Sequence, residues 1–303
     1  MTTLSEMVNE VSINLAGYTI QQDRSTFVRT TAVGSADTVL NLGSTDSVGK
    51  GIVEIDDELI WVDSYDRLNN TASIAPYGRG YLGTTAAAHA ANTKVTISPT
   101  FPRFTIKRAI NDTIRAVGQT LSVVKATTFV YNSAVTTYEF SGLDIQNILS
   151  LSYESIGPSK EWIPVRRWRF DSYADDVTWG GVEGSSQTVS VYDIFTSGRT
   201  VKVVYLTNPA PLSANENVFT TVTGFKETTR DIIIYGAIYR LLTFLDPARA
   251  AMVAPQADET DSKRPFGSSG STSRQIYNLY AQRLNEEVKN QQSNYPIRVH
   301  YAN

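Results

Sequence analysis

The residue types best suited to catalysis gather in one short acidic stretch. Asp56, Asp57, Glu58 and Asp63 could supply a general acid and base, or carboxylate ligands for a divalent cation. The residues on either side predict a β-hairpin, in which adjacent residues point to opposite faces, and the stretch lacks the spacing of a calcium-binding loop. We therefore interpret these carboxylates as a polar turn.

Acidic residues next to tryptophan suggest a second chemistry, the binding of carbohydrate. Asp175-Asp176 lies close to Trp179, whose ring could stack on a sugar, and Glu161 lies close to Trp162 and Trp168. A surface turn explains these patterns more simply. A carbohydrate-binding protein is therefore the least favoured of the alternatives that we keep.

Nucleophilic catalysis and metal binding find little support in the composition. The chain has no cysteine and two histidines, His89 and His300, so thiolate chemistry, disulfides and Cys- or His-rich metal sites are excluded. Gly78, Gly80 and Gly83 have the spacing of a dinucleotide fingerprint, but no βαβ pattern surrounds them. A Ser–His–Asp triad would have to use His89. We expect no enzymatic activity, no cofactor and no metal.

The net charge of the chain favours no class of partner, but the charged residues are distributed unevenly along the sequence. The 303 residues carry 27 Lys and Arg against 30 Asp and Glu, so neither nucleic acid nor a membrane is favoured overall. No segment predicts a transmembrane helix or a secretory signal, and we expect a soluble protein. Two clusters of basic residues could form an ordinary solvated surface, or they could contact a neighbouring subunit or line a channel. Their candidate contact residues are Arg103, Lys107, Arg108, Arg115, Arg166 and Arg167.

Alternating helical and strand-like patterns predict an α+β fold. Thr3 and Glu6 have the spacing of a capping box, and Gly51–Ile55 with Glu58–Val62 predicts a hairpin. A second helix opens near Pro102, with an apolar seam that continues to Val124. The predicted segments are an N-terminal helix (1–17), a β-rich lobe (18–98), a core helix (99–126), a β-sandwich-like lobe (127–222), C-terminal helices (223–292) with a flexible loop (255–272), and an extended tail (293–303).

This order of elements predicts how the lobes are supported. We expect four helices to pack together as a helical bundle base, with the two β-rich lobes inserted between them in the sequence. The last of these helices starts near Thr272 or Ser273.

One stretch resembles a known group of proteins. Tyr77–Val95, YGRGYLGTTAAAHAANTKV, resembles an RGxxGTTAAAHAAGTxV stretch that recurs in structural proteins of tailed bacteriophages, and Pro99–Ile114 follows it. With the N-terminal helix and the hairpin, most of residues 1–125 resembles the head-to-tail connector (adaptor) proteins of long-tailed phages, particularly those of actinobacterial hosts. Asn92 stands where glycine is expected, and both tolerate a positive φ. We expect Arg79 and His89 to tie the loop down.

The resemblance implies a structural virion protein that assembles in the host cytoplasm. It implies a ring of twelve copies in the phage neck, between the portal protein and the next neck or tail-terminator protein, with weak nonspecific contacts to DNA in the lumen. The C-terminal segment Ser273–Asn303 would bind the portal. Its candidate residues are Tyr277, Tyr280, Arg283, Tyr295, Ile297, Arg298, Val299, His300 and Tyr301. The alternatives within the virion are a tail terminator and a minor tail or receptor-binding subunit.

Overall fold

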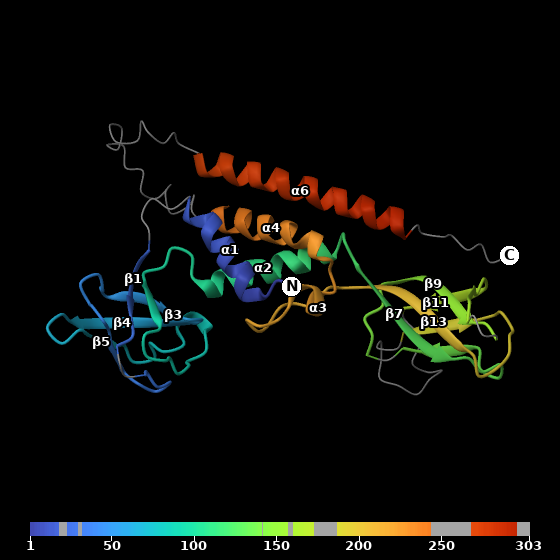
Figure 1. The fold of residues 1–303 in the computed structure, drawn as a ribbon, viewed down its shortest axis with the longest axis horizontal. Coiled ribbons are helices and arrows are strands. Elements are labelled where there is room, and N and C mark those ends of the chain that lie inside the picture. Colours follow the sequence, from blue (N-terminus) through green and yellow to red (C-terminus); the bar gives the residue numbers. More distant parts are fainter. Residues whose placement is uncertain are drawn as a thin grey trace. The chain divides into compact units, whose positions relative to one another are not determined.

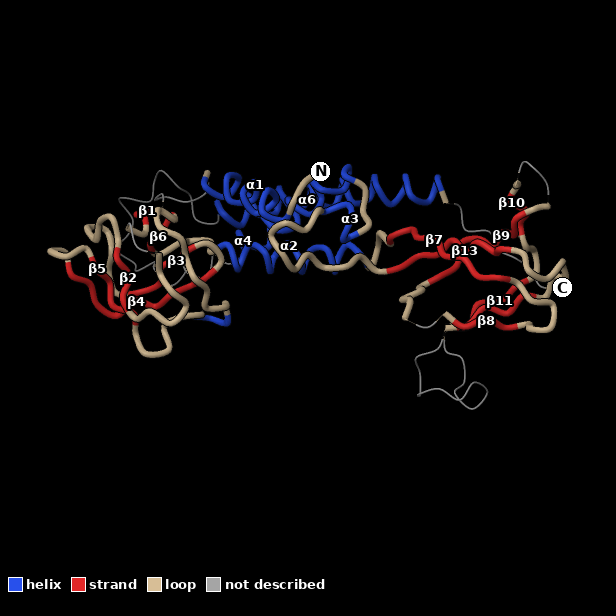
Figure 2. Tube along the Cα trace, turned by 60° about the horizontal axis from the view of Figure 1, so that its bottom comes forward, coloured by secondary structure: helices blue, strands red, loops and turns tan. Residues whose placement is uncertain are grey.

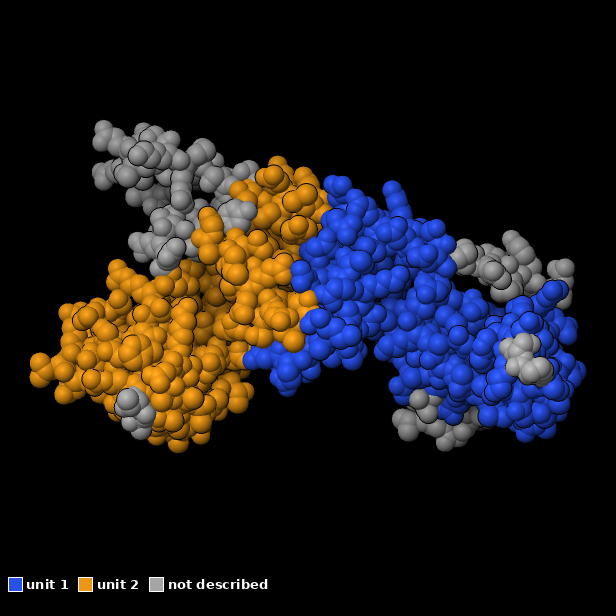
Figure 3. Space-filling model, viewed as in Figure 1, with its two compact units in different colours: residues 1, 114–232, 281–303 blue, residues 2–113, 233–280 orange. Residues whose placement is uncertain are grey.

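The computed structural model describes residues 1–17, 23–29, 32–140, 142–156, 160–172, 187–243 and 268–295. Helices and antiparallel sheets both occur, so the fold is α+β (Figure 1). The chain divides into two compact units, shown in Figure 3. Unit 1 comprises residues 1, 114–232 and 281–303, and unit 2 comprises residues 2–113 and 233–280.

The first helix of unit 2, α1 (Leu4–Ala16), begins as its sequence predicts. The Thr3 hydroxyl accepts from the Glu6 backbone N–H at 3.3 Å, and the Glu6 carboxylate accepts from the Thr3 N–H at 2.9 Å. This confirms the capping box, which satisfies two amides that a helix start would leave without partners. The buried stripe of α1 consists of Leu4, Met7, Val8, Val11 and Leu15.

The sheet of unit 2 is a small closed barrel. Its strands are β1 (Arg24–Phe27), β2 (Val39–Asn41), β3 (Gly51–Ile55), β4 (Glu58–Asp66), β5 (Thr71–Ile74) and β6 (Lys94–Ile97), in the order β1-β6-β3-β4-β5-β2. The two outermost strands meet through a bridge between Val28 and Leu42 and through a 2.8 Å bond from the Gly43 N–H to the Phe27 carbonyl. The strands gather around one centre in Figure 2, and their apolar side chains fill it.

The predicted hairpin is confirmed within this barrel. β3 and β4 pair antiparallel from Gly51↔Val62 to Ile55↔Glu58, and Asp56-Asp57 form the turn. Asp56 has a φ of 53°, a backbone conformation that Asp tolerates better than most residues.

The second predicted helix ends earlier than its apolar seam suggests. It is α2 (Arg103–Gly118), and Val123–Val130 form strand β7. The amides of Thr120 and Leu121 both bond to the Val117 carbonyl, which closes the helix in a tight turn. Val124 was placed on the helix because the apolar spacing persists, but the β-branched run at 123–124 favours a strand.

Helical segments also contact one another within unit 2. A guanidinium nitrogen of Arg103 in α2 donates to Asn9 of α1 at 2.8 Å. Gly236 of α4 (Arg230–Thr243) lies against Thr113 of α2. Tyr239 of α4 lies 5.5 Å, between ring centroids, from Tyr280 of α6 (Ser268–Asn294).

Unit 1 contains two antiparallel sheets that share one core. The four-stranded sheet has the order β10-β9-β13-β7, and the three-stranded sheet has the order β11-β12-β8. The core takes residues from both sheets, among them Leu151, Val189 and Val203. The remaining strands are β8 (Thr137–Glu139), β9 (Asn147–Glu154), β10 (Trp162–Pro164), β11 (Trp168–Asp171), β12 (Thr188–Val191) and β13 (Thr200–Thr207).

The last helix is longer than predicted at both ends. Short helical segments, α3 (Phe219–Thr223) and Glu227–Thr229, precede α4, and α6 then runs from Ser268 to Asn294. The prediction that the loop extends to residue 272 is wrong, because residues 268–272 already belong to α6, and a glycine such as Gly270 costs a helix only about 1 kcal/mol. Residues 255–267 of the predicted loop and 296–303 of the predicted tail lie outside the described residues.

Candidate functional site

The most densely bonded polar group in unit 2 is the carboxylate of Glu58, at the start of β4. Its side chain is fully buried and binds Nε and Nη2 of Arg79 at 2.8 and 2.9 Å. It also accepts from the backbone N–H groups of Gly80 and Ala87, at 2.9 and 3.0 Å, and lies 2.8 Å from Nε2 of His89. Burial alone would raise the pKa of Glu58, but these hydrogen bonds outweigh it and lower the pKa to about 2.

Arg79 and His89 connect this carboxylate to the rest of the loop. Arg79 donates to the carbonyls of Gly34 and Ala87, both at 2.6 Å. His89 lies 2.9 Å from Asp56 and exchanges two backbone hydrogen bonds with Val33. The expectation that Arg79 and His89 tie the loop down is therefore confirmed.

The same geometry corrects the interpretation of the acidic stretch. Asp56 and Asp57 form a polar turn as predicted, but that interpretation is wrong for Glu58 and Asp63, which both lie in β4. Glu58 is buried at the centre of the network, and Asp63 is exposed on the strand. Gly80 has a φ of 61°, which lets its N–H point at this carboxylate without strain. Both ring nitrogens of His89 are engaged, so neither faces an open site. Across the described ranges, no three His, Asp or Glu side chains are placed to hold a metal ion.

Two of the predicted basic contact residues form ion pairs within unit 2. Nζ of Lys107 lies 2.6 Å from Asp57, and Nε of Arg103 lies 3.6 Å from the same carboxylate. The Arg103 N–H, at the start of α2, donates to Glu54 of β3 at 2.5 Å. Burial raises the pKa of Glu54 to about 7, against the lowering effects of Arg103. These contacts join the barrel to α2 inside one unit.

The other basic candidates lie on exposed surface. Arg108 and Arg115 are exposed on α2, and Arg166 and Arg167 are exposed between β10 and β11. Asp193 accepts from the backbone amides of both Arg166 and Arg167, at 2.7 and 3.1 Å, which fixes their backbone. Their contacts with a neighbouring subunit or with DNA stay predictions.

The structure brings together only part of the proposed carbohydrate-binding set. Trp162 is half-exposed and lies beneath Nζ of Lys202, 5.5 Å from the ring centroid. Asp175, Asp176 and Trp179 lie outside the described residues. No described contact joins Trp162 to a carboxylate pair suited to glycoside chemistry.

The predicted portal-binding residues on α6 differ in exposure. Tyr277 is 48% exposed, whereas Tyr280 is 8% exposed and packs against Tyr239. Arg283 binds Asp231 at 2.7 Å and also pairs with Glu286 of its own helix. The remaining candidates, Ile297, Arg298, Val299, His300 and Tyr301, lie outside the described residues.

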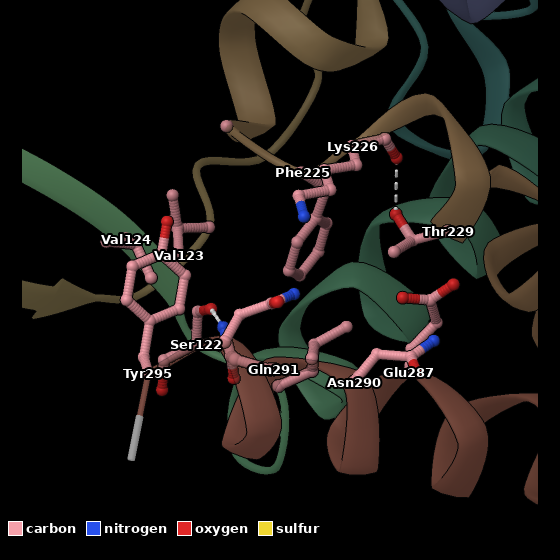
Figure 4. Close-up of a pocket in the computed structure, with 13 residues that line it drawn as sticks. Ser122, Val123, Val124, Phe225, Lys226, Thr229, Glu287, Asn290, Gln291 and Tyr295 are labelled. Atoms are coloured by element: carbon pink, nitrogen blue, oxygen red, sulfur yellow. Dashed lines mark hydrogen bonds between the residues drawn. The ribbon is translucent and has the colours of Figure 1, made fainter. Parts of the chain in front are cut away.

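A small cavity of about 130 Å³ in unit 1 reaches Tyr295, the last described residue (Figure 4). The last turns of α6, the start of β7 and the segment from Gly224 to Thr229 line it. Gln291 donates to the Ser122 carbonyl at 2.5 Å across this cavity. Sequence reasoning missed the site because its walls come from three segments far apart in the chain. The apolar spacing of the last helix was the available signal.

Comparison with known proteins identifies the chain. The family model described as SU10 adaptor protein matches residues 82–299, more than half of the chain. The chain belongs to the SU10 adaptor protein family. It is therefore a structural adaptor protein of a phage virion. A comparison with curated proteins finds no match.

The SU10 adaptor match covers some of the candidate residues and not others. It includes α2, both sheets of unit 1 and α6, and it begins after Arg79 and Glu58. Among the described segments of this adaptor, no helix has the length and hydropathy needed to cross a membrane.

Proposed function

We propose that this adaptor forms a ring in the phage neck, where it joins the portal protein to the next neck or tail-terminator protein and lets DNA pass. The match to the SU10 adaptor protein family over residues 82–299 is the observation that carries the proposal. The resemblance of Tyr77–Val95 to phage structural proteins also supports it, although the match covers all of that stretch except residues 77–81. That resemblance also supports the narrower assignment to connectors of long-tailed phages of actinobacterial hosts.

The ring that we propose has twelve copies, with α1, α2, α4 and α6 as a four-helix base. Contacts between α1 and α2, between α2 and α4, and between α4 and α6 within unit 2 support this arrangement. We propose no catalytic role, which is supported by the closed bonding around Glu58 and His89.

The C-terminal segment is the proposed portal contact. Tyr277 and Tyr295 keep exposed rings on or just beyond α6, and aromatic side chains are enriched at protein interfaces. A chain end can wrap a partner surface. Tyr280 would contribute indirectly, by holding α6 against Tyr239.

Mass measurement and cryo-electron microscopy of the purified chain with its portal test this proposal. We expect a closed ring stacked on the portal. A chain that stays monomeric with its portal would overturn the proposal. A sixfold ring bound at the tail would favour a tail terminator instead, and a threefold assembly would favour a receptor-binding subunit.

A further inference from the structure

The outer face of α6 carries a row of three amide side chains and one lysine. Gln282, Asn285, Lys289 and Gln292 recur at alternating spacings of three and four residues, and all four are exposed. The same spacing continues upstream in the sequence through Asn278 and Gln275. Residues at these spacings lie along one side of a helix. We call Gln282, Asn285, Lys289 and Gln292 the amide row.

The amide row faces away from the residues that anchor α6 in unit 1. Arg283 and Gln291 bind Asp231 and the Ser122 carbonyl, on the opposite side of the helix from the row. Among the described residues, the side chains of Asn285 and Gln292 make no hydrogen bond within the chain. Asn285, Lys289 and Gln292 are therefore available to an external partner, whereas Gln282 already donates to Glu286.

The charges on α6 favour an anionic partner. Its two carboxylates, Glu286 and Glu287, are both paired with Arg283, and Gln282 donates to Glu286 at 3.1 Å. Lys289 adds a positive charge within the row itself. Over residues 282–292, the outer face of the helix thus presents amides and one ammonium group, with no unpaired carboxylate, and the exposed Arg274 adds a second positive charge further upstream on the same side.

Amides at successive row positions fit a polar partner better than a second helix. A helix–helix seam at this spacing needs apolar side chains, and amides buried in it would lose hydrogen bonds to water. Asn and Gln side chains can instead donate to phosphate oxygens without ion pairing. Such contacts release few counterions, so they are weak and let the nucleic acid slide.

We infer that the amide row faces the phosphate backbone of double-stranded DNA in the channel of the ring. The inference rests on the proposed neck ring and names the surface of the chain that lines it. Identical copies would place one row each around the duplex, with Lys289 as the only charge of the row.

Photo-crosslinking in intact virions tests the inference. Phage particles are produced with p-benzoylphenylalanine in place of Asn285, and with the same substitution at Asn290 as the matched control. Asn290 is also an exposed asparagine of α6, but it lies on the cavity side. We expect light-dependent adducts with DNA from position 285 and a loss of these adducts at position 290.

Other outcomes of this experiment would overturn the inference. Adducts from position 285 to another copy or to another virion protein would assign the row to a protein interface. Equal DNA adducts from both positions, or none from either, would also reject it. Microscopy of the same particles separates the two proposals, since a chain absent from the neck would reject the ring itself.

A charge substitution gives a second measurement that does not depend on crosslinking. Asn285→Lys adds a phosphate contact per copy, so we expect slower DNA ejection from purified particles and a steeper dependence on salt. Asn290→Lys should eject DNA at the wild-type rate. Equal ejection rates for the two variants would contradict the inference.

Discussion

Arg79 binds the buried carboxylate of Glu58 through two parallel hydrogen bonds of 2.8 and 2.9 Å. This fork geometry is specific to a guanidinium and a carboxylate, and it joins a long loop to the first residue of β4. The two backbone amides on the same carboxylate, from Gly80 and Ala87, show that the loop is folded around this one group.

Removing the charge of Glu58 should destabilise the barrel strongly. Glu58→Gln leaves the Arg79 guanidinium without its counterion, and breaking a buried pair in this way costs about 3–5 kcal/mol. Urea unfolding of the purified chain measures the loss. The matched control is Asp63→Asn, which breaks an exposed pair with Lys50 and should cost about 0–1 kcal/mol. Equal losses would show that the buried pair is not a principal contact of the loop.

The carboxyl of Glu54 should make unit 2 less stable as the pH rises. Its folded pKa of about 7 lies above the ordinary value of 4.5, so the folded state holds its proton more tightly. The resulting stabilisation is full below the ordinary pKa and is lost as the pH rises through 7. Between about pH 5 and about pH 8, wild type should lose about 2–3 kcal/mol more than Glu54→Gln. Urea unfolding at both pH values measures the difference. Equal losses of stability in wild type and Glu54→Gln would refute the raised pKa of Glu54.

The contact between α4 and α2 should not accept a methyl group at Gly236. A Cβ there would lie 2.3 Å from Cγ2 of Thr113, which is fully buried. Gly236→Ala should therefore destabilise by about 1–3 kcal/mol, although alanine favours helix more than glycine does. Adding Thr113→Ser removes that methyl group and keeps the hydroxyl that bonds to Ala109, so stability should recover in thermal unfolding. If the double variant is no more stable than Gly236→Ala, the destabilisation does not come from contact with the Thr113 methyl group.

Two tyrosines on α6 should separate portal binding from stability. Tyr280→Ala removes a buried ring and should cost about 3–5 kcal/mol. Tyr277→Ala removes an exposed ring that makes one edge contact with Tyr239, which predicts a cost of about 1 kcal/mol. Portal affinity, measured by biolayer interferometry, should fall for Tyr277→Ala and be retained by Tyr277→Phe. Wild-type portal affinity in Tyr277→Ala would remove this residue from the proposed contact.

Features that depend on neighbouring residues in the chain could be predicted from the sequence. The Thr3–Glu6 capping box and the hairpin around Asp56 are local patterns with local causes. The end of α2 was missed because the apolar spacing continues into β7, where packing against a sheet decides the conformation. A spacing that suits both elements cannot mark the boundary between them.

Features that depend on distant residues could not be predicted in the same way. Glu58 looks like a turn carboxylate in the sequence, and its burial follows from donors that arrive from Arg79, Ala87 and His89. The cavity beside Tyr295 likewise needs three separate segments to form. The sequence predicts that Arg79 and His89 tie the loop down, but not which carboxylate they bind.

The bridge between Val28 and Leu42 affects how copies of this chain can meet. Because it pairs the two outermost strands, the described strands of the barrel offer a foreign chain no row of open backbone groups to extend. The sheets of unit 1, by contrast, end in β7, β10, β8 and β11. In the ring that we propose, this pairing would prevent strand exchange between the barrels of neighbouring copies, so any contact made by the barrel would use side chains and loops.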